Sequence, residues 1–299
     1  MSPTLRTPDS ATAPPVEEQV SARVGSTYML TLEYDGAGFS GWQRQPGRRT
    51  VEGTLQLAIN QATGETPSLT ASGRTDAGAH AHGQVAGCTL RSAWDCERLR
   101  TALNARLPED VCVVALKTAP PGFHARFDAI ARTYRYVVAP RPRRAVGRQY
   151  AWFVEGDMDL EAMRRGARHL VGTHDFAAFG RSPRPGGATV RTVHDVDVRL
   201  LPMAGVRALV AAATPAPARG VVVIDVTADA FLHGMMRALA GALVDVGRGR
   251  LEPAELGAML GEGRRRPHAP RHAPAHGLHQ WRVIYPSAGA ALPAGEFLP

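Results

Sequence analysis

The sequence contains almost no lysine: Lys117 is the single lysine among its 35 Lys and Arg residues. Positive charge therefore comes from arginine, whose planar guanidinium can grip a carboxylate or a phosphate through two parallel hydrogen bonds. With 27 acidic residues, the formal net charge is +8. A basic protein favours polyanions, because neutralised phosphates release counterions. The charge is compatible with a nucleic-acid partner but does not identify one.

Cysteine and long apolar runs are also scarce. The three cysteines, Cys88, Cys96 and Cys112, are odd in number and not closely paired, so we expect buried thiols in a reducing compartment. No apolar run is long enough to span a bilayer. The N-terminal 25 residues lack the apolar core of a signal peptide. We therefore expect a cytoplasmic protein without a membrane segment.

A length of 299 residues with 44% hydrophobic content allows one large domain or two modest ones. Residues 1–25 are rich in Pro, Ala, Ser and Thr without periodicity, which predicts a disordered tail. Residues 287–299 are expected to form a second loose tail. The Arg- and Pro-rich stretch 141–148 is a candidate connector. It would divide the chain into an N-terminal subdomain at 26–140 and a C-terminal subdomain at 149–286.

Hydrophobic periodicity in the first half predicts the order strand, helix, strand, strand, helix, strand. Thr50 is a candidate N-cap for the first helix, and Gly64 is its candidate stop. This order resembles a ferredoxin-like unit. The expected strands cover residues 28–34, 68–72, 84–90 and 111–118, and the expected helices cover 51 to Gly64 and about 95–106.

The second half repeats this pattern loosely. Its expected strands cover residues 132–138, 150–154, 190–200, 206–213, 221–228 and 281–285. One helix is expected between Asp157 or Asp159 and Gly172. Another, with an apolar stripe, is expected to open at Phe231 and close at Gly247. A third follows Glu252, which precedes a proline at the first turn.

A glycine-flanked loop, residues 73–78, holds Arg74 and Asp76 two positions apart. Glycines allow a tight turn and close approach of a partner. One interpretation is an ordinary hairpin loop, with Asp76 as a turn former and Arg74 as its exposed salt partner. The other is a projecting carboxylate that acts as a nucleophile or general base. The spacing alone leaves both open.

Residues 73–85, GRTDAGAHAHGQV, closely resemble the active-site segment of the tRNA pseudouridine synthase A family. Further segments are similar to the same family over roughly residues 28–285. They are YDGAGFSGWQRQ at 34–45, LNARLP at 103–108, GFHARFDA at 122–129 and GTHDFAAF at 172–179. The chain departs from the family pattern at Gly234 and Ala238, which puts the surroundings of the nearby Arg237 in question. It also departs at His276 and Gln280, on either side of Leu278.

The resemblance implies an α+β pseudouridine synthase fold. Two ferredoxin-like, RRM-like subdomains would share a central mixed, largely antiparallel sheet with a cleft between them. It also implies a homodimeric enzyme that isomerises uridine to pseudouridine in the anticodon stem-loop of tRNA, at positions 38, 39 and 40. The reaction involves no redox change and consumes no water, so neither a cofactor nor a metal is implied.

The resemblance assigns roles to several residues. Asp76 would be the catalytic carboxylate, ionised although partly buried, and Arg237 would be its ion-pair partner. Tyr134 would stack on the target base, a contact that tolerates any base identity. Leu278 would form the other wall, and Arg74 would grip the RNA or splay the target nucleotide.

The loop at 34–45 carries two further candidates, Gln43 and Arg44, which could meet the RNA backbone. The same loop could instead be only a packed, glycine-rich turn.

Other functions remain open at the level of sequence. A ferredoxin-like pair with a basic surface would suit a non-catalytic RNA-binding protein, although such a protein has no need of the Asp76 loop. Histidines at 80 and 82, and at 268, 272 and 276, invite a metal-dependent hydrolase, but neither set shows a recognised ligand spacing. A pseudouridine synthase acting on ribosomal RNA is a third alternative.

Overall fold

The computed structural model describes residues 25–142, 145, 147–201, 220–261 and 271–286. The tails predicted at 1–25 and 287–299 lie essentially outside this part. So do the strand predicted at 206–213 and most of residues 263–276, an Arg- and Pro-rich stretch that includes His268. No helix among the described residues is long and apolar enough to cross a membrane.

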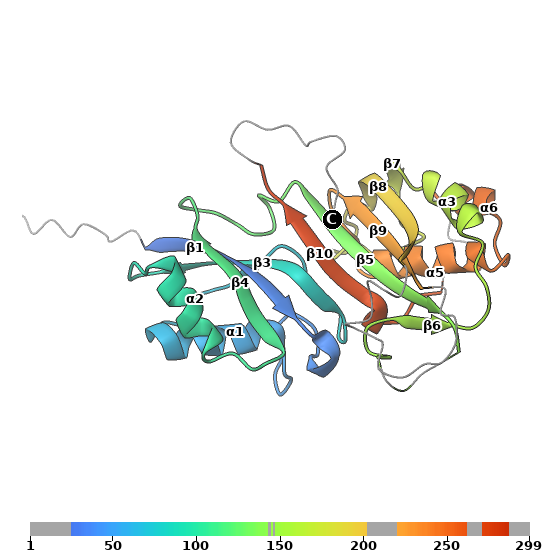
Figure 1. The fold of residues 1–299 in the computed structure, drawn as a ribbon. Helices are drawn as coiled ribbons and strands as arrows, with labels where there is room; N and C mark the ends of the chain where they lie inside the picture. Colours follow the sequence, from blue (N-terminus) through green and yellow to red (C-terminus); the bar gives the residue numbers. More distant parts are fainter. Residues whose placement is uncertain (1–24, 143–144, 146, 202–219, 262–270, 287–299) are drawn as a thin grey trace, which may run out of the picture.

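The described strands form one ten-stranded sheet (Figure 1). They are β1 (Ser26–Tyr34), β2 (Thr70–Ala71), β3 (His80–Leu90), β4 (Val111–Thr118), β5 (Ala131–Pro140), β6 (Trp152–Val154), β7 (Gly172–Asp175), β8 (Val190–Leu201), β9 (Val221–Ala228) and β10 (Leu278–Ile284). The main path runs β4-β1-β3-β10-β5-β9-β8-β7, with β2 beside β3 and β6 beside β5. Only the β3–β10 and β5–β6 pairs are parallel.

The described helices form two groups, one on each half of the sheet (Figure 1). They are α1 (Val51–Thr63), α2 (Cys96–Asn104), α3 (Leu160–Arg168), α5 (Met235–Gly247) and α6 (Pro253–Ala258), with short 3-10 turns η1 (Gly36–Gly38) and η2 (Ala275–Gly277). Helix α1 begins and ends at the capping residues predicted from the sequence. The Thr50 side chain accepts a hydrogen bond from the Gly53 amide, and Gly64 adopts the left-handed conformation at the C-cap.

Strand order reveals two ferredoxin-like units. The first is β1-α1-β2-β3-α2-β4, and the second is β5-α3-β8-β9-α5-β10. In each unit the fourth strand lies beside the first, the first beside the third, and the third beside the second. Strand β10, the last of the second unit, also pairs with β3 of the first and so joins the two halves. The expected fold class is thus confirmed. Strand β5 pairs with β9 and β10, so we propose that residues 131–140 belong with the second unit.

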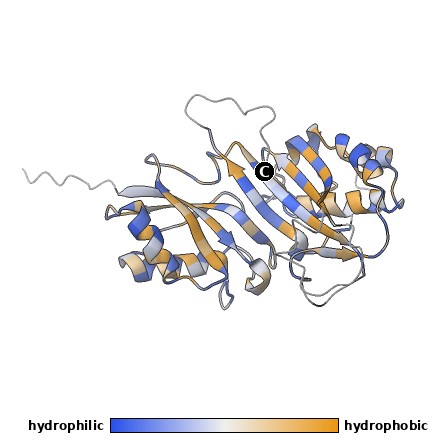
Figure 2. Cartoon of the chain, viewed as in Figure 1, coloured by the Kyte–Doolittle hydropathy of each residue, from blue (hydrophilic) through white to orange (hydrophobic). Residues whose placement is uncertain are grey.

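The helices that the structure describes all pack on the same face of the sheet. Residues directly opposite in neighbouring strands point to the same face. One row of such opposite residues crosses the sheet from β1 through β3, β10 and β5 to β9. It consists of Tyr34, Ala81, Gln280, Tyr134 and Val226. Tyr34 and Ala81 belong to the core under α1 and α2, whereas Tyr134 and Val226 belong to the core under α3 and α5. Hydrophilic and hydrophobic residues alternate along several strands, as Figure 2 shows, because the other face, called the open face below, carries no helix among the described residues.

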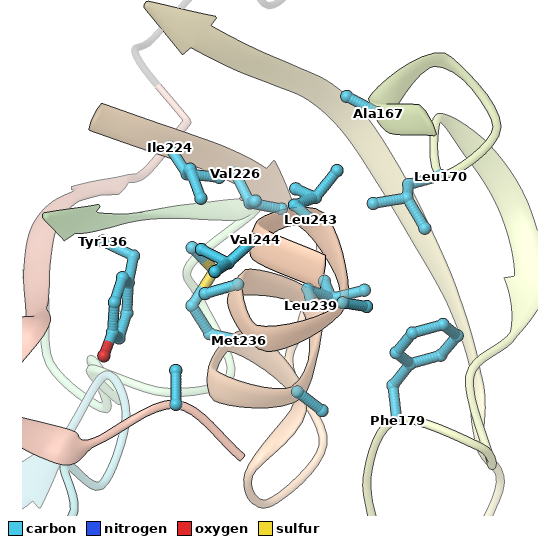
Figure 3. Close-up of a cluster of buried hydrophobic side chains, with 14 of the residues drawn as sticks. Tyr136, Ala167, Leu170, Phe179, Ile224, Val226, Met236, Leu239, Leu243 and Val244 are labelled. Carbon is cyan, nitrogen blue, oxygen red and sulfur yellow. The ribbon is translucent and has the colours of Figure 1, made fainter. Parts of the chain in front are cut away.

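Helix α5 forms the centre of the second core. Its side chains meet strand residues such as Ile224 and Val226 and the loop residue Phe179 (Figure 3). Every residue of α5 except Arg237 and Asp245 is buried. A helix that is apolar nearly all round is held by its neighbours on several sides. The first turn of α5 therefore holds the backbone of Arg237 in a fixed position.

Two helix boundaries differ from the prediction. Helix α5 begins at Met235 rather than Phe231, because Gly234 adopts a left-handed φ of 77° and cannot continue a helix. The residues before it are extended, and His233 pairs with Arg181 through two backbone hydrogen bonds. Helix α3 ends at Arg168, not at Gly172, which instead opens strand β7.

The cysteines were also expected to be buried, and for Cys112 this is wrong. Cys88 is buried, Cys96 is partly buried, and Cys112 is exposed. Cys112 lies on β4, which is an edge strand whose alternate residues point away from the helices. The three thiols are free.

The open face of the sheet carries a row of stacked rings where the halves join. The His279 ring lies 4.8 Å from that of His80 and 5.4 Å from that of His82. His279 Nε2 donates to the Tyr150 carbonyl at 3.1 Å, and Nδ1 has no hydrogen-bond partner among the described residues. Burial lowers the pKa of His279 to about 3, and nearby His80 adds to this.

We predict that acid weakens the fold through this histidine. Between pH 6.5 and 3 the unfolded chain binds a proton at His279 that the folded chain does not, so the free energy of unfolding falls as pH falls. At pH 5 the loss should be about 2 kcal/mol relative to pH 7.5. Urea unfolding at both pH values checks this. His279→Phe should reduce the acid-dependent loss by about that amount, and equal losses in the two proteins would refute the assignment.

Candidate active site

A cavity of about 1020 Å³ opens on the helix-covered face between the two helical groups. The loop between β2 and β3 lines one side and supplies Asp76. The first turn of α5 lines the opposite side and supplies Arg237. Strand β5 contributes Tyr134, and the start of β10 contributes Leu278. The cavity therefore draws on both ferredoxin-like units and on the strand that joins them.

The Asp76 loop is held in place by hydrogen bonds from surrounding elements. The Trp42 amide donates to the Thr75 carbonyl at 3.1 Å. The Tyr34 hydroxyl lies 2.8 Å from the Thr75 hydroxyl in a buried contact. Gln84 Nε2 donates to the Gly73 carbonyl at 2.8 Å. After Asp76, the Gly78 amide donates to the Phe39 carbonyl at 3.3 Å. Because both flanks of Asp76 are fixed, its carboxylate is positioned before any ligand arrives.

Gly41 approaches this loop so closely that no side chain fits. It adopts a φ of 88°, and a Cβ placed there would lie 2.7 Å from the Thr75 carbonyl oxygen. We predict that Gly41→Ala destabilises the protein by more than about 2 kcal/mol, through backbone strain and this clash together, and lowers turnover by displacing Asp76.

Gly47 provides a matched control in the same segment. It also has a positive φ, 67°, but a Cβ there would meet nothing within 4 Å. Gly47→Ala should therefore cost only the backbone strain of about 1 kcal/mol and leave turnover unchanged. Urea unfolding and turnover of both variants decide the matter. If Gly41→Ala lowered the free energy of unfolding and the turnover no more than Gly47→Ala does, the predicted clash would be contradicted.

Asp76 and Arg237 form an ion pair across the cavity. Arg237 Nη1 donates to Asp76 Oδ2 at 2.8 Å, and both side chains are about a quarter exposed, at 24% and 23%. Arg237 Nε donates to the Ala273 carbonyl at 2.7 Å, while its own carbonyl accepts from the Ala273 amide at 3.0 Å. The exposed His233 brings Nδ1 to 3.9 Å from Asp76 Oδ1. The guanidinium is thus fixed by two acceptors, the Asp76 carboxylate and the Ala273 carbonyl.

Tyr134 and Leu278 form apolar surface beside this pair. The Tyr134 ring meets Phe231 edge-on, with centroids 4.7 Å apart. Both Tyr134 and Leu278 are less than a tenth exposed. Burial raises the pKa of Tyr134 to about 12, so its phenol stays neutral at physiological pH. A neutral ring beside a carboxylate is suited to stacking, not to proton transfer as a base.

The structure brings most of the predicted site residues together. Asp76, Arg237, Tyr134, Leu278, Arg74 and Gln43 all line the same cavity. Arg44 does not: its guanidinium donates to Gln56 on α1 at 3.0 Å. Arg74 is exposed, and the partner of Asp76 is Arg237 rather than Arg74. The interpretation of this loop as a simple turn, in which Arg74 is the salt partner of Asp76, is therefore wrong about that ion pair.

Sequence reasoning missed Arg132, which is buried at the cavity wall. Its guanidinium donates to the Ser72 carbonyl at 3.3 Å and to the Asp229 carbonyl at 2.6 Å, and also contacts carbonyls of the 126–129 segment. Burial lowers its pKa. Arg132 ties the start of the Asp76 loop to the other half of the site. Its position two residues before Tyr134, on the same strand face, was the available signal.

The arrangement does not resemble a metal centre. Among the residues that the structure describes, no group of three or more His, Cys, Asp or Glu side chains is placed to hold a metal ion. His80 and His82 stack against His279 on the open face, behind the sheet from the cavity. His268 lies outside the described residues.

Comparison with known proteins identifies the family. A family model described as tRNA pseudouridine synthase matches residues 31–128 and 167–286. The chain belongs to the tRNA pseudouridine synthase family. Because a pseudouridine synthase rearranges uridine without net gain or loss of atoms, the chain is an enzyme of the isomerase class. The matched stretches contain Asp76, Arg237 and Leu278, whereas Tyr134 falls between them.

Individual family members are similar over most of their length. The tRNA pseudouridine synthase A of Chlorobium phaeovibrioides is 38% identical over 261 residues, which are 86% of this chain and 98% of that protein. The tRNA pseudouridine synthase A of Frankia casuarinae is 44% identical over 263 residues, 86% of this chain and 88% of that protein. The Bacillus subtilis protein of the same name is 38% identical over 258 residues, 85% of this chain and 97% of its own.

Proposed function

We propose that this synthase converts uridine to pseudouridine in the anticodon stem-loop of tRNA, around positions 38 to 40, with Asp76 as the catalytic carboxylate and without a cofactor. The main support for this proposal is the Asp76–Arg237 ion pair at 2.8 Å. It lies beside the buried ring of Tyr134, in a cavity lined by both ferredoxin-like units. The names of the relatives support tRNA as the substrate.

The reaction needs little beyond such a site. The bond between uracil N1 and ribose C1′ breaks, the detached base turns, and its C5 bonds to the same C1′. The proton on C5 leaves and N1 takes up a proton, so atoms and electrons balance. Asp76 either attacks C1′ or removes the proton from C2′, and both routes require an ionised carboxylate within reach of the sugar.

The neighbours of Asp76 supply the other requirements. Arg237 holds the carboxylate in position, because its guanidinium donates both to Asp76 and to the Ala273 carbonyl. Tyr134 offers a neutral ring on which the detached uracil can stack while it turns. Leu278 closes an apolar wall of the same cavity and limits escape of the base.

The rim of the cavity suits an RNA backbone. Arg74, Arg126 and Arg181 line it together with Gln43. Extruding a nucleotide from a helical stem costs a few kcal/mol, which phosphate contacts must offset. A second copy of the chain could hold the body of the tRNA while one subunit carries out the reaction. The homodimer stays a prediction.

Treatment of unmodified tRNA transcripts with the protein, followed by mapping of every pseudouridine, tests this function. We expect new pseudouridine in the anticodon stem-loop, around positions 38 to 40, without added metal or cofactor. Binding without modification would favour the RNA-binding alternative. Modification of ribosomal RNA but not of tRNA would favour a different substrate. Either result would overturn the proposal.

A further inference from the structure

A large aromatic side chain is exposed at the rim of the cavity. Phe127 is 69% exposed, the most of any large hydrophobic residue that the structure describes. It lines the same cavity as Asp76, together with His124 and Arg126. The proposed function above gives no part to Phe127 or His124. An exposed phenylalanine beside a functional cavity is a candidate contact for a ligand.

Phe127 and His124 form a paired aromatic surface. Their ring centroids are 4.2 Å apart and their planes differ by 32°. The guanidinium carbon of Arg126 lies 5.8 Å from the Phe127 ring centroid. His124 Nδ1 accepts a hydrogen bond from the Arg126 amide at 3.1 Å, which assigns the ring proton to Nε2. The segment thus combines two stacked rings with a cation.

The backbone beneath this pair is fixed. The Ala125 amide donates to the Thr70 hydroxyl at 3.3 Å, and the Ala125 carbonyl accepts from the Tyr285 hydroxyl at 2.6 Å. Arg132 donates to the Ala129 carbonyl at 3.1 Å. Phe127 is therefore exposed because it is held outward, not because the segment lacks contacts. A rigid aromatic loses little conformational entropy when a ligand stacks on it.

We propose that His124 and Phe127 form a stacking subsite for an unpaired base next to the extruded uridine of the tRNA. This inference rests on the proposed function. Rings interleaved with arginines are typical of surfaces that bind single-stranded RNA bases. The cavity, at about 1020 Å³, is at the upper end of the usual range for small-molecule sites, about 300–1,000 Å³. It therefore has room for a nucleotide and part of its neighbour.

The charge around the subsite favours RNA over a protein partner. Arg74, Arg126 and Arg181 line the same cavity, and extrusion of a nucleotide brings its flanking phosphates to this rim. An apolar protein segment would have to cover these guanidinium groups without supplying phosphates. A neighbouring base, in contrast, stacks on the rings while its phosphate meets the arginines.

Phe127→Ala provides the first test, measured with an unmodified anticodon stem-loop RNA. We expect binding about tenfold weaker, within the usual range for one aromatic–base stack, and an unchanged rate at saturating RNA. Phe127→Trp should retain wild-type affinity because it retains an aromatic face. Leu57→Ala serves as a matched control, since Leu57 is 57% exposed on α1, away from the cavity, and should bind like the wild type.

An abasic nucleotide next to the target uridine completes a double-mutant cycle. On one flank, removing the base should weaken wild-type binding about tenfold and leave Phe127→Ala binding unchanged. If the effects of Phe127→Ala and of the abasic nucleotide on the binding free energy simply added on both flanks, the subsite would be refuted. Wild-type affinity of Phe127→Ala would refute it too. In either case, turnover by the wild-type protein would still support the proposed function. A wild-type protein that modifies no tRNA would refute the proposed function itself.

Discussion

Asp76→Asn should abolish pseudouridine formation while the protein still folds and binds tRNA. Asparagine has nearly the same shape and can still accept a hydrogen bond from Arg237, which lies 2.8 Å from the carboxylate. It can neither attack ribose C1′ nor remove the C2′ proton as a carboxylate does. We expect a single-turnover rate at least about 10⁴-fold lower, comparable to the loss of a catalytic nucleophile elsewhere. Quenched time courses with excess enzyme measure this rate.

Asp110→Asn is the matched control for this variant. Asp110 forms an ion pair with Arg49 at 2.7 Å in the same half of the molecule, but neither residue lines the cavity. The control removes a comparable carboxylate and should change turnover by less than about threefold, because surface ion pairs contribute little. Appreciable turnover by Asp76→Asn, with tRNA affinity intact, would remove Asp76 from the chemistry.

Arg237→Lys should lower turnover by about 100-fold, the usual effect of losing one preorganised donor in an active site. Arginine at this position reaches Asp76 with Nη1 and the Ala273 carbonyl with Nε. A lysine ammonium is a compact point charge and cannot hold both acceptors in that geometry. Single-turnover kinetics with saturating tRNA should show the defect in the rate constant, with little change in affinity.

Arg250→Lys makes the same chemical change just beyond the far end of α5. Arg250 pairs with Asp245 at 3.7 Å, is about half exposed, and does not line the cavity. This control should behave as the wild type. If Arg237→Lys also retained wild-type turnover, the ion-pair role of Arg237 would be excluded, and the fixed geometry around Ala273 would need another explanation.

Much of the fold follows from local signals in the sequence. The mostly apolar run at 111–118 gives strand β4 at its observed bounds, and Thr50 and Gly64 delimit helix α1. These features depend on contacts between residues close in the chain, where periodicity and capping act directly. The start of α5 was mispredicted because apolar periodicity gave no sign of the left-handed conformation of Gly234.

The arrangement of the site could not be predicted from the spacing of residues along the chain. Asp76 and Arg237 lie 161 positions apart, and they meet only because β10 joins the two units. The pair was expected from family resemblance, not from any pattern within the chain. The stack of His80 on His279 likewise depends on a parallel pairing of two short stretches. Long-range register of this kind is set by the whole sheet.

Release of the C5 proton is the most direct measure of the central claim, that Asp76 acts on the sugar of an extruded uridine. An anticodon stem-loop RNA with tritium at C5 of a single uridine, around position 39, would be incubated with excess enzyme. The account predicts that the wild type releases the label to water as C5 bonds to C1′, and that Asp76→Asn binds the RNA equally well but releases none. Release by Asp76→Asn at the wild-type rate, or retention of the label by the wild type at every uridine from 38 to 40, would contradict it.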